Sequence, residues 1–340
     1  MEQNRKVTIA DIATRSGVSK TTVSRVLNEK PDVDAKTRKL ILKIIQDTGF
    51  VPQKSAINLV KGKTGLIGLV VPSLTNPYSL TVIQGVAEGI AETDYELVLY
   101  TTSLMEKNQK RFIPRLTGNV TDGLVVLLPR NFEKYGDELF KTHFPTVLVD
   151  HRGVGGVGSK FPSITAANRP GAYEATKYLI SLGHRRIGFI TGIMDFGCSR
   201  DRLEGYRDAL REASIDFDSE LIEYGDFSRH SGKECAMKLM GISSRPTAIF
   251  CSNDEMAFGT MDVARDMGIR VPQDLSVIGF DDLPTAGFSV PALTTVRQPL
   301  HEMGRSAASL LLEQISGGAP RNKDIVLGTS LVIRDTCSRH

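Results

Sequence analysis

Apolar positions change their spacing along the chain, and this change divides it into two unlike parts. Over the first 50 residues they recur three and four residues apart, as in Ile9, Ile12 and Ala13, which is the spacing of one helical face. From Thr64 onward, short continuous apolar runs alternate with longer helical patterns. Such alternation is typical of parallel sheets covered on both faces. The sequence therefore predicts a small helical head followed by an α/β core.

Three short helices are predicted in the head. Thr8 and Asp11 have the spacing of a capping box, Gly17 lies where the chain must turn, and Ser19 can cap a second helix. A third helix is expected to begin near Asp34. The residues expected to be buried in the second and third helices are Val23, Val26, Leu27, Leu40, Ile41, Ile44 and Ile45. Close packing of the first two helices across a tight turn predicts a helix-turn-helix.

The outward face of the second helix carries hydroxyls and cations and no acid from that helix. Its residues are Lys20, Thr21, Thr22, Ser24 and Arg25. Such donors suit phosphate oxygens and base edges in a major groove. Residues 1–64 hold 13 Lys and Arg against 6 Asp and Glu, whereas the rest of the chain holds 29 against 33. A basic head on a mildly acidic body favours a polyanionic partner, although a solvated basic surface is the plainer interpretation of charge alone.

The core is predicted to be two similar lobes. Strands are expected at 66–71, 96–100, 124–128, 146–149, 186–190, 247–251 and 276–280, and helices near 78–93, 168–183, 200–213, 229–240, 254–267 and 301–316. The order strand, polar loop, helix, strand occurs near the start of the core and again from about residue 185. We therefore expect two doubly wound parallel sheets with a ligand in the cleft outside the strand ends.

Several classes of protein are disfavoured. No apolar run approaches the roughly 18–20 residues that span a bilayer, and the polar N-terminus does not resemble a secretory signal, so a cytoplasmic protein without membrane association is expected. The cysteines at 198, 235, 251 and 337 form no C-x-x-C pair, which favours core residues over a disulfide frame or a metal site. Walker, G-x-S-x-G, H-E-x-x-H and dinucleotide-binding motifs are lacking, so neither a cofactor nor an enzyme is expected.

The head closely resembles the DNA-binding domain of the LacI (lactose-repressor) family. VTIADIATRSGVSKTTVSRVLN and VDAKTRKLILKIIQDTGFVP combine the capping box, the turn glycine, V-S-x-x-T-V-S-R-V-L-N and a T-G-F-x-P exit. The resemblance implies that residues 1–51 bind palindromic double-stranded operator DNA within a homodimer. It also implies that Lys20, Thr21 and Arg25 touch bases, whereas Thr8, Ser19, Thr22, Ser24 and Asn28 mostly touch phosphates.

Residues 52–63 have the composition of a marginal helix or a flexible tether. The resemblance implies a hinge helix that forms on DNA and pairs with its dimer mate in the minor groove. Leu59 matches the leucine that wedges between base pairs, and such wedges kink the duplex. Ile57 stands where many members carry arginine, so either one phosphate contact is missing or Ile57 packs elsewhere.

Residues 64–340 resemble the periplasmic-binding-protein fold of the family's regulatory core. The resemblance implies an N-lobe at about 64–163 and 295–326, and a C-lobe at about 164–294 and 327–340. It places effector contacts at Tyr78, Ser79, Asp150, Arg202, Phe227, Asn253, Asp281 and Leu300. Asp, Asn and Arg can bond vicinal hydroxyls, and an aromatic face covers the C–H side of a pyranose, so a sugar suits the set better than a planar base. Each of these residues has a plainer interpretation when it is taken alone. Asp150 or Asp281 could cap a strand end, Phe227 could be a core residue, and Arg202 could be a surface ion-pair partner.

The resemblance implies a dimeric, sequence-specific transcriptional repressor whose DNA affinity is changed by a small sugar-like effector. A corepressor-dependent regulator remains an alternative. An enzyme could use the acid pair Asp281 and Asp282, and a sugar-binding transport component would share the core fold but would need an export signal and no basic head. The chain ends at TSLVIRDTCSRH without a leucine-heptad helix, which favours a dimer over a tetramer.

Overall fold

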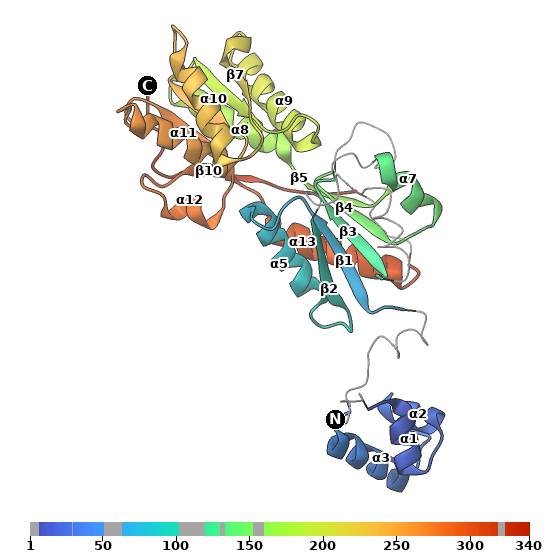
Figure 1. Cartoon of the computed structure of the whole chain (residues 1–340). Coiled ribbons are helices and arrows are strands. Elements are labelled where there is room, and N and C mark those ends of the chain that lie inside the picture. Colours follow the sequence, from blue (N-terminus) through green and yellow to red (C-terminus); the bar gives the residue numbers. More distant parts are fainter. Residues whose placement is uncertain are drawn as a thin grey trace. The chain divides into compact units, whose positions relative to one another are not determined.

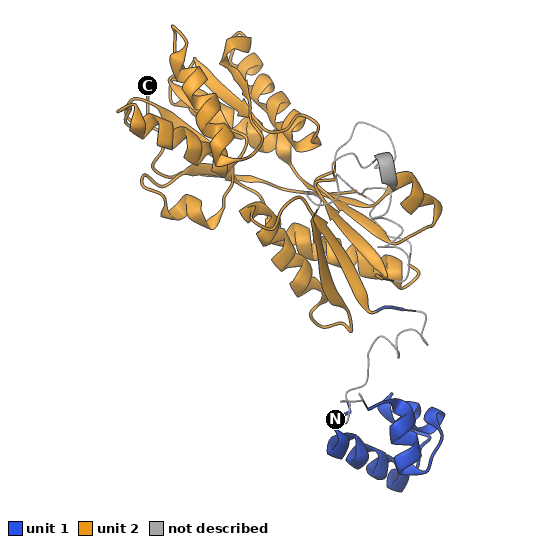
Figure 2. Cartoon of the chain, in the orientation of Figure 1, with its two compact units in different colours: residues 1–64 blue, residues 65–340 orange. Residues whose placement is uncertain are grey.

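The computed structural model describes residues 7–28, 30–50, 63–101, 120–129, 133–151, 160–318 and 324–340. The chain forms two compact units, residues 1–64 and 65–340 (Figure 2). The first unit contains the helices α1 (Ile9–Ser16), α2 (Lys20–Leu27) and α3 (Ala35–Thr48). The second contains two six-stranded sheets with helices on both of their faces (Figure 1). The predicted α/β class, with a three-helix head and two doubly wound sheets, is confirmed.

Side-chain caps set the helix boundaries of the head where the sequence predicts them. The backbone N–H of Thr8 donates to Asp11 Oδ2 at 2.8 Å, and the side chain of Thr8 caps α1 in return. Gly17 ends α1 with φ +70°, a left-handed conformation that glycine adopts without strain. Ser19 accepts from the N–H of Thr22 at 3.1 Å at the start of α2. Local chemistry alone therefore defines the tight turn.

The core of the head is small and consists of buried residues from all three helices, namely Ile12, Ala13, Val23, Val26 and Ile41. Leu27, Ile44 and Ile45 pack against it. The prediction that Leu40 is buried is wrong, because its residue is 47% exposed. Successive helical residues are 100° apart, so Ile41 at the centre of the inner face leaves Leu40 on the flank.

The first sheet of the core has the strand order β11-β5-β4-β3-β1-β2, and all its pairs are parallel. Its strands are β1 (Leu66–Val71), β2 (Glu96–Thr101), β3 (Gly123–Leu127), β4 (Thr146–Val149), β5 (Ser163–Ala166) and β11 (Asp324–Leu327). Its helices are α5 (Pro77–Ile90), α7 (Glu133–Lys141) and α13 (Leu300–Ile315).

The second sheet has the order β12-β10-β9-β8-β6-β7, with β12 antiparallel to β10. Its strands are β6 (Ile187–Thr191), β7 (Ile222–Tyr224), β8 (Ala248–Cys251), β9 (Ser276–Asp281), β10 (Thr294–Arg297) and β12 (Ser330–Val332). Its helices are α8 (Asn168–Ser181), α9 (Gly197–Glu212), α10 (Arg229–Gly241), α11 (Asp254–Asp266) and α12 (Pro284–Phe288), and a 3-10 turn covers Ser219–Leu221.

The strands that the sequence pattern missed are short. Strands β5, β10, β11 and β12 have three or four residues each, and none of them is apolar throughout. Strand β5 nevertheless is fully buried, because its hydroxyls find partners inside the lobe. The chain crosses between the sheets after β5, after β10 and after β11, a few residues beyond each expected lobe boundary.

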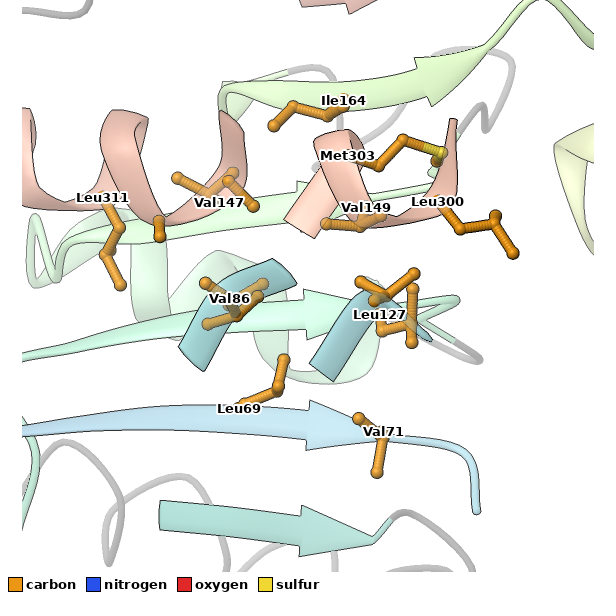
Figure 3. Packing of buried hydrophobic residues seen from close by; sticks show 14 of the residues in the cluster. Leu69, Val71, Val86, Leu127, Val147, Val149, Ile164, Leu300, Met303 and Leu311 are labelled. Atoms are coloured by element: carbon orange, nitrogen blue, oxygen red, sulfur yellow. The ribbon is translucent and has the colours of Figure 1, made fainter. Parts of the chain in front are cut away.

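Alternate residues of the first sheet enter two separate clusters. Leu69, Leu127 and Val147 face α5 and α13, as Figure 3 shows. Leu124 and Val126 point to the other face and pack with Leu139 of α7. This period of two is the geometry of a pleated strand buried on both faces. Among the described helices, none is long and apolar enough to cross a membrane.

Helices α5 and α13 approach closely because glycines face each other. A Cβ added to Gly85 would overlap the backbone oxygen of His301, and one added to Gly304 would overlap the backbone oxygen of Val82. We expect Gly85→Ala to lower the free energy of unfolding of the core by about 1–3 kcal/mol, since the helices must separate. The matched control is Gly241→Ala at the exposed end of α10, where a Cβ meets nothing within 4 Å. Urea unfolding of both variants tests this, and equal midpoints would contradict it.

Candidate functional site

The predicted DNA-binding side chains of the head that the structure describes lie on α2 and its two caps, except for Thr8, which caps α1. Lys20, Thr21 and Arg25 are exposed, as are the capping residues Thr8 and Ser19, whereas Thr22, Ser24 and Asn28 are half-buried. The last three are in part committed locally, since the amide of Asn28 donates to the backbone oxygen of Ser24 at 2.7 Å. Of the exposed groups, Ser19, Lys20 and Thr21 lie at the N-terminus of α2, where the helix dipole also favours negative charge. Arg25 lies in the last turn of α2, and Thr8 caps α1.

No acid occurs within α2 itself, but the segment that follows brings one to its face. The guanidinium of Arg25 donates to the carboxylate of Asp32, and this hydrogen bond lowers the pKa of Asp32. The two side chains are 49% and 47% exposed. Exposed ion pairs are weak, so DNA can replace Asp32 as the partner of Arg25. Leu59 and Ile57 lie outside the described residues.

A cleft in the second unit lies between the first lobe, built on β1–β5 and β11, and the second lobe, built on β6–β10 and β12. It is lined by Asn76, Tyr78, Leu128 and Asp150 of the first lobe and by Cys198, Arg202, Phe227, Asn253 and Asp281 of the second. Six of the eight predicted effector contacts are therefore brought together in one place. The enclosed space is only about 30 Å³. That volume suits about one water molecule, so the cleft must widen to admit a sugar.

Four of the lining residues have left-handed backbones. The φ angles are +45° at Leu128, +55° at Asp150, +71° at Phe227 and +126° at Asp281. Each lies at or just beyond the carboxyl end of a strand, where the chain must turn sharply. Non-glycine residues in such conformations cost free energy and concentrate at functional sites. The strain is observed independently of the predicted site and coincides with it.

Asp150 is held by two hydroxyls. The phenol of Tyr78 donates to one carboxylate oxygen, and Thr165 Oγ1 donates to the other at 3.0 Å. Burial, together with the charge of Asp150, raises the pKa of Tyr78 well above its usual range. Tyr78 therefore stays protonated and donates, and the pair forms a fixed polar surface on the first lobe.

Arg202 is buried on α9 with only 2% of its surface exposed. Its Nε donates to Asn168 Oδ1 at 2.9 Å, and its Nη1 donates to the backbone oxygen of Ser252. The guanidinium carbon lies 3.8 Å from the centroid of the Phe280 ring, in the geometry of a cation–π contact. The plainer interpretation of Arg202 as a surface ion-pair partner is therefore wrong. A buried guanidinium with N–H groups at the cleft can bind hydroxyl or anionic groups of a ligand.

Asp281 is the acidic side chain that the second lobe contributes to the cleft. Burial raises the pKa of Asp281 to about 7, and the charge of Arg202 and a hydrogen bond from Gln298 oppose this rise. Gln298 Nε2 donates to Asp281 Oδ1 at 2.6 Å. The carboxyl can accept from ligand hydroxyls when ionised and donate to them when protonated.

The position of the Phe227 ring at the cleft depends on a glycine, Gly192, which has no side chain. A Cβ added to Gly192 would overlap the ring of Phe227, so the glycine makes room for that ring. Asn253 donates to the backbone oxygen of Phe227 at 3.0 Å and caps α11 by accepting from Met256 at 2.9 Å. Asn253 therefore lines the cleft chiefly as the support of Phe227, since both ends of its amide have protein partners.

Two predicted contacts do not line the cleft. Ser79 is fully buried one position beyond Tyr78 in α5, and Leu300 begins α13 inside the core of the first lobe. Three lining residues were missed by the sequence analysis. Cys198 precedes Arg202 by one helical turn, so its position on the same face of α9 could have been predicted from the sequence. Asn76 caps α5 and Leu128 directly follows β3, but neither type of residue suggests a ligand by itself.

A larger hollow lies elsewhere in the second lobe, beside α11 and α12. Its volume is about 800 Å³, and its lining includes Arg229, Phe258, Arg265, Phe288 and Val290. None of the predicted effector residues lines it. Size alone does not identify a site, and the strained strand ends and buried charges lie in the smaller cleft.

Comparisons with known proteins give matches in both units of the chain. Residues 8–53 match the bacterial regulatory proteins of the lacI family, and residues 176–337 match a periplasmic binding protein-like domain. The chain is 33% identical over 333 residues to the HTH-type transcriptional repressor PurR of Vibrio vulnificus, covering 98% of this chain and 99% of that protein. It is 31% identical over 334 residues to the repressor CytR of Escherichia coli, covering 98% and 97% respectively.

Solved structures show the same likeness. A lac repressor dimer bound to operator and the anti-inducer ONPF aligns with a TM-score of 0.87 at 27% identity, over 98% of this chain and 100% of that one. The transcriptional regulator CelR in complex with cellobiose aligns with a TM-score of 0.75 at 32% identity, over 97% and 99%. The chain therefore belongs to the lacI family of bacterial regulatory proteins.

Proposed function

We propose that the protein is a cytoplasmic transcriptional repressor whose affinity for a palindromic operator is set by a sugar bound in the interlobe cleft. The observation that carries the proposal is the meeting of buried Asp150, Arg202 and Asp281 from two lobes in one cleft. Residues 1–51 bind DNA, residues 52–63 form the hinge with Leu59 as its wedge, and residues 64–340 bind the effector. Effector and operator then change each other's affinity by the same factor.

The chemistry of the cleft favours a sugar over a planar base. Acids on both sides and a buried guanidinium can bond vicinal hydroxyls, and Phe227 offers a face to apolar C–H groups. Relatives support this class of ligand, since one similar regulator was solved with cellobiose and another, 25% identical, with ribose. A thermal-shift screen with cellobiose, D-ribose, D-glucose and D-galactose, followed by operator binding with each hit, tests the proposal. Operator DNA is obtained by selection from a random-sequence duplex pool.

A homodimer is proposed from the exposed apolar side chains beside the larger hollow. Phe288 is 86% exposed and Val290 is 95% exposed, and both line that hollow. Large apolar side chains so exposed mark interaction surfaces, and a second copy of the chain is the partner that a palindromic operator requires. One similar structure is a lac repressor dimer on its operator.

The enzyme alternative has little support in the cleft. Asp282 does not join Asp281 there, because its carboxylate pairs with Arg297 and Arg334 at 2.6 Å each. The adjacent acids therefore face different surroundings and cannot act as a pair on one substrate. A transport-linked sugar-binding protein would not explain the donor-rich face of α2.

We expect Arg25→Ala to reduce discrimination between operator and random DNA, because a base-edge contact is worth roughly 1–3 kcal/mol. Arg15→Ala is the matched control, since it removes one exposed cation of the head from α1. Fluorescence anisotropy with both DNAs at several salt concentrations measures the effect. An equal loss on both DNAs would identify Arg25 as a phosphate contact instead.

Arg202→Ala and Asp281→Asn should each weaken effector binding by about ten- to hundredfold, because a hydrogen bond to a charged group contributes about 1.5–3 kcal/mol. Asp282→Asn is the matched control, since it alters the neighbouring acid outside the cleft. Titration calorimetry with the sugar found in the screen measures the affinities. Wild-type affinity in both cleft variants would mean that the effector binds elsewhere.

Phe288→Glu should weaken dimerisation by about thirtyfold or more, as expected for a buried aromatic anchor worth about 2 kcal/mol. The control is Tyr224→Glu, which alters a 66% exposed aromatic residue on the edge strand β7. Sedimentation velocity over a range of protein concentrations reports the dimer. The surface is wrongly assigned if both variants dimerise alike.

A further inference from the structure

Two of the three crossings between the lobes carry a buried amide side chain. Asn168 follows the first crossing, after β5, and is 1% exposed. Gln298 follows the second crossing strand, β10, and is 4% exposed. The sequence analysis assigned no role to either residue. Each contacts one of the two charged side chains that the second lobe presents to the cleft.

Asn168 connects the crossing to Arg202. Its Oδ1 accepts from Arg202 Nε at 2.9 Å, while its Nδ2 donates to the backbone oxygen of Ala166 at 3.1 Å. The same Nδ2 lies 3.4 Å from Thr165 Oγ1, which donates to Asp150. A continuous chain of hydrogen bonds therefore runs from the acid of the first lobe, through the crossing, to the arginine of the second.

Gln298 makes the equivalent connection to Asp281. Its Nε2 donates to Asp281 Oδ1 at 2.6 Å, and its backbone N–H donates to the backbone oxygen of Asp281 at 3.3 Å. The amide oxygen Oε1 is buried and accepts no hydrogen bond from any residue that the structure describes. Gln298 therefore joins the crossing to Asp281 through both its side chain and its backbone.

The third crossing, between β11 and β12, offers a comparison. Thr329 Oγ1 donates to the backbone oxygen of Ala167 at 3.2 Å, which ties two crossings together. Thr329 makes no hydrogen bond to Arg202 or Asp281 in the described structure. It thus supports the same region without touching a charged group of the cleft.

We infer that Asn168 and Gln298 are positioning residues that couple effector contacts to movement of the lobes, by binding Arg202 and Asp281 directly to the crossing segments. The inference rests on the proposed function of the cleft. An effector that pulls on either charge also pulls on the segment about which the lobes turn. Sites are coupled when one element with two arrangements is biased by both, and the crossings are such an element.

The coupling between sugar binding and operator binding distinguishes this role from a merely structural one. Loss of an amide that only orients Arg202 or Asp281 would weaken sugar binding, but saturating sugar would restore the full change in operator affinity. Loss of an amide that also transmits the signal lowers the ratio of operator affinities without and with saturating sugar. That ratio is the coupling factor, and it does not depend on the sugar affinity.

The experiment uses the full-length dimer, selected operator DNA, and the sugar among cellobiose, D-ribose, D-glucose and D-galactose that changes wild-type operator binding most. The variants are Asn168→Ala and Gln298→Met, which keep no donor at these positions, with Thr329→Ala as the matched control. Sugar affinity is measured by calorimetry and the coupling factor by anisotropy at saturating sugar. Thermal unfolding without ligand checks that each variant is folded.

We expect both amide variants to bind sugar roughly tenfold more weakly, in line with loss of a hydrogen bond to a charged group. Their coupling factor should fall to below about a third of the wild-type value, whereas Thr329→Ala should keep both quantities within about twofold. Asn168→Asp retains the acceptor for Arg202 but not the donor to Ala166. Asn168→Asp should therefore bind sugar more tightly than Asn168→Ala does, but with a reduced coupling factor. It replaces Asn168→Ala in the test if that variant does not fold.

A wild-type coupling factor in the folded amide variants at saturating sugar would overturn the inference, whatever their sugar affinity. An equal loss in Thr329→Ala would also overturn it, because general loosening of the crossings would then explain the effect. If wild-type operator binding responds to none of the four sugars, the proposed sugar effector fails and the inference fails with it. Failure of the proposed function is thus visible in the wild type, whereas failure of the inference alone is visible only in the variants.

Discussion

The cleft is organised around one constraint, which is that a buried charge must have partners. Arg202 and the carboxyls of Asp150 and Asp281 are each at least 97% buried, and the loss of water around an unpaired ion would be prohibitive. An aromatic ring and a side-chain amide contact Arg202, two hydroxyls donate to Asp150, and a second amide donates to Asp281. Several of these partners lie on the crossing segments. The demand for satisfied charges thus links the ligand-binding surface to the parts of the chain that join the lobes.

Parallel sheets bring these groups together because their strands end on the same edge. Leu128, Asp150 and Asp281 all lie at strand ends, and the backbone there turns through left-handed conformations. Such strained positions need a rigid surround, which the doubly covered sheets provide. The space of about 30 Å³ is too small for a sugar, so the cleft must widen when a sugar binds. A ligand shifts the arrangement of the lobes only in so far as it binds one arrangement more tightly than the other.

The structure of the head depends on a small core and on local side-chain caps. Five buried residues form its core, and side-chain caps at Thr8, Ser19 and Asp34 define where its helices begin. A unit of this size leaves most of its polar side chains in water, which suits a surface that must exchange solvent for phosphates. The contact of Arg25 with Asp32 shows that even here a residue outside α2 can modify the face of that helix.

The sequence by itself determined the elements that local rules govern. Caps, turn glycines and long apolar runs predicted the head and seven core strands, and motif resemblance predicted most of the cleft, because the chemical types at strand ends are visible in the chain. Tertiary structure decided what depends on neighbours distant in sequence. Ser79 and Leu300 were excluded from the cleft and Cys198 was added to it by helix orientation. Asn168 and Gln298 contact Arg202 and Asp281 across 34 and 17 positions of the chain, a separation that no local pattern encodes.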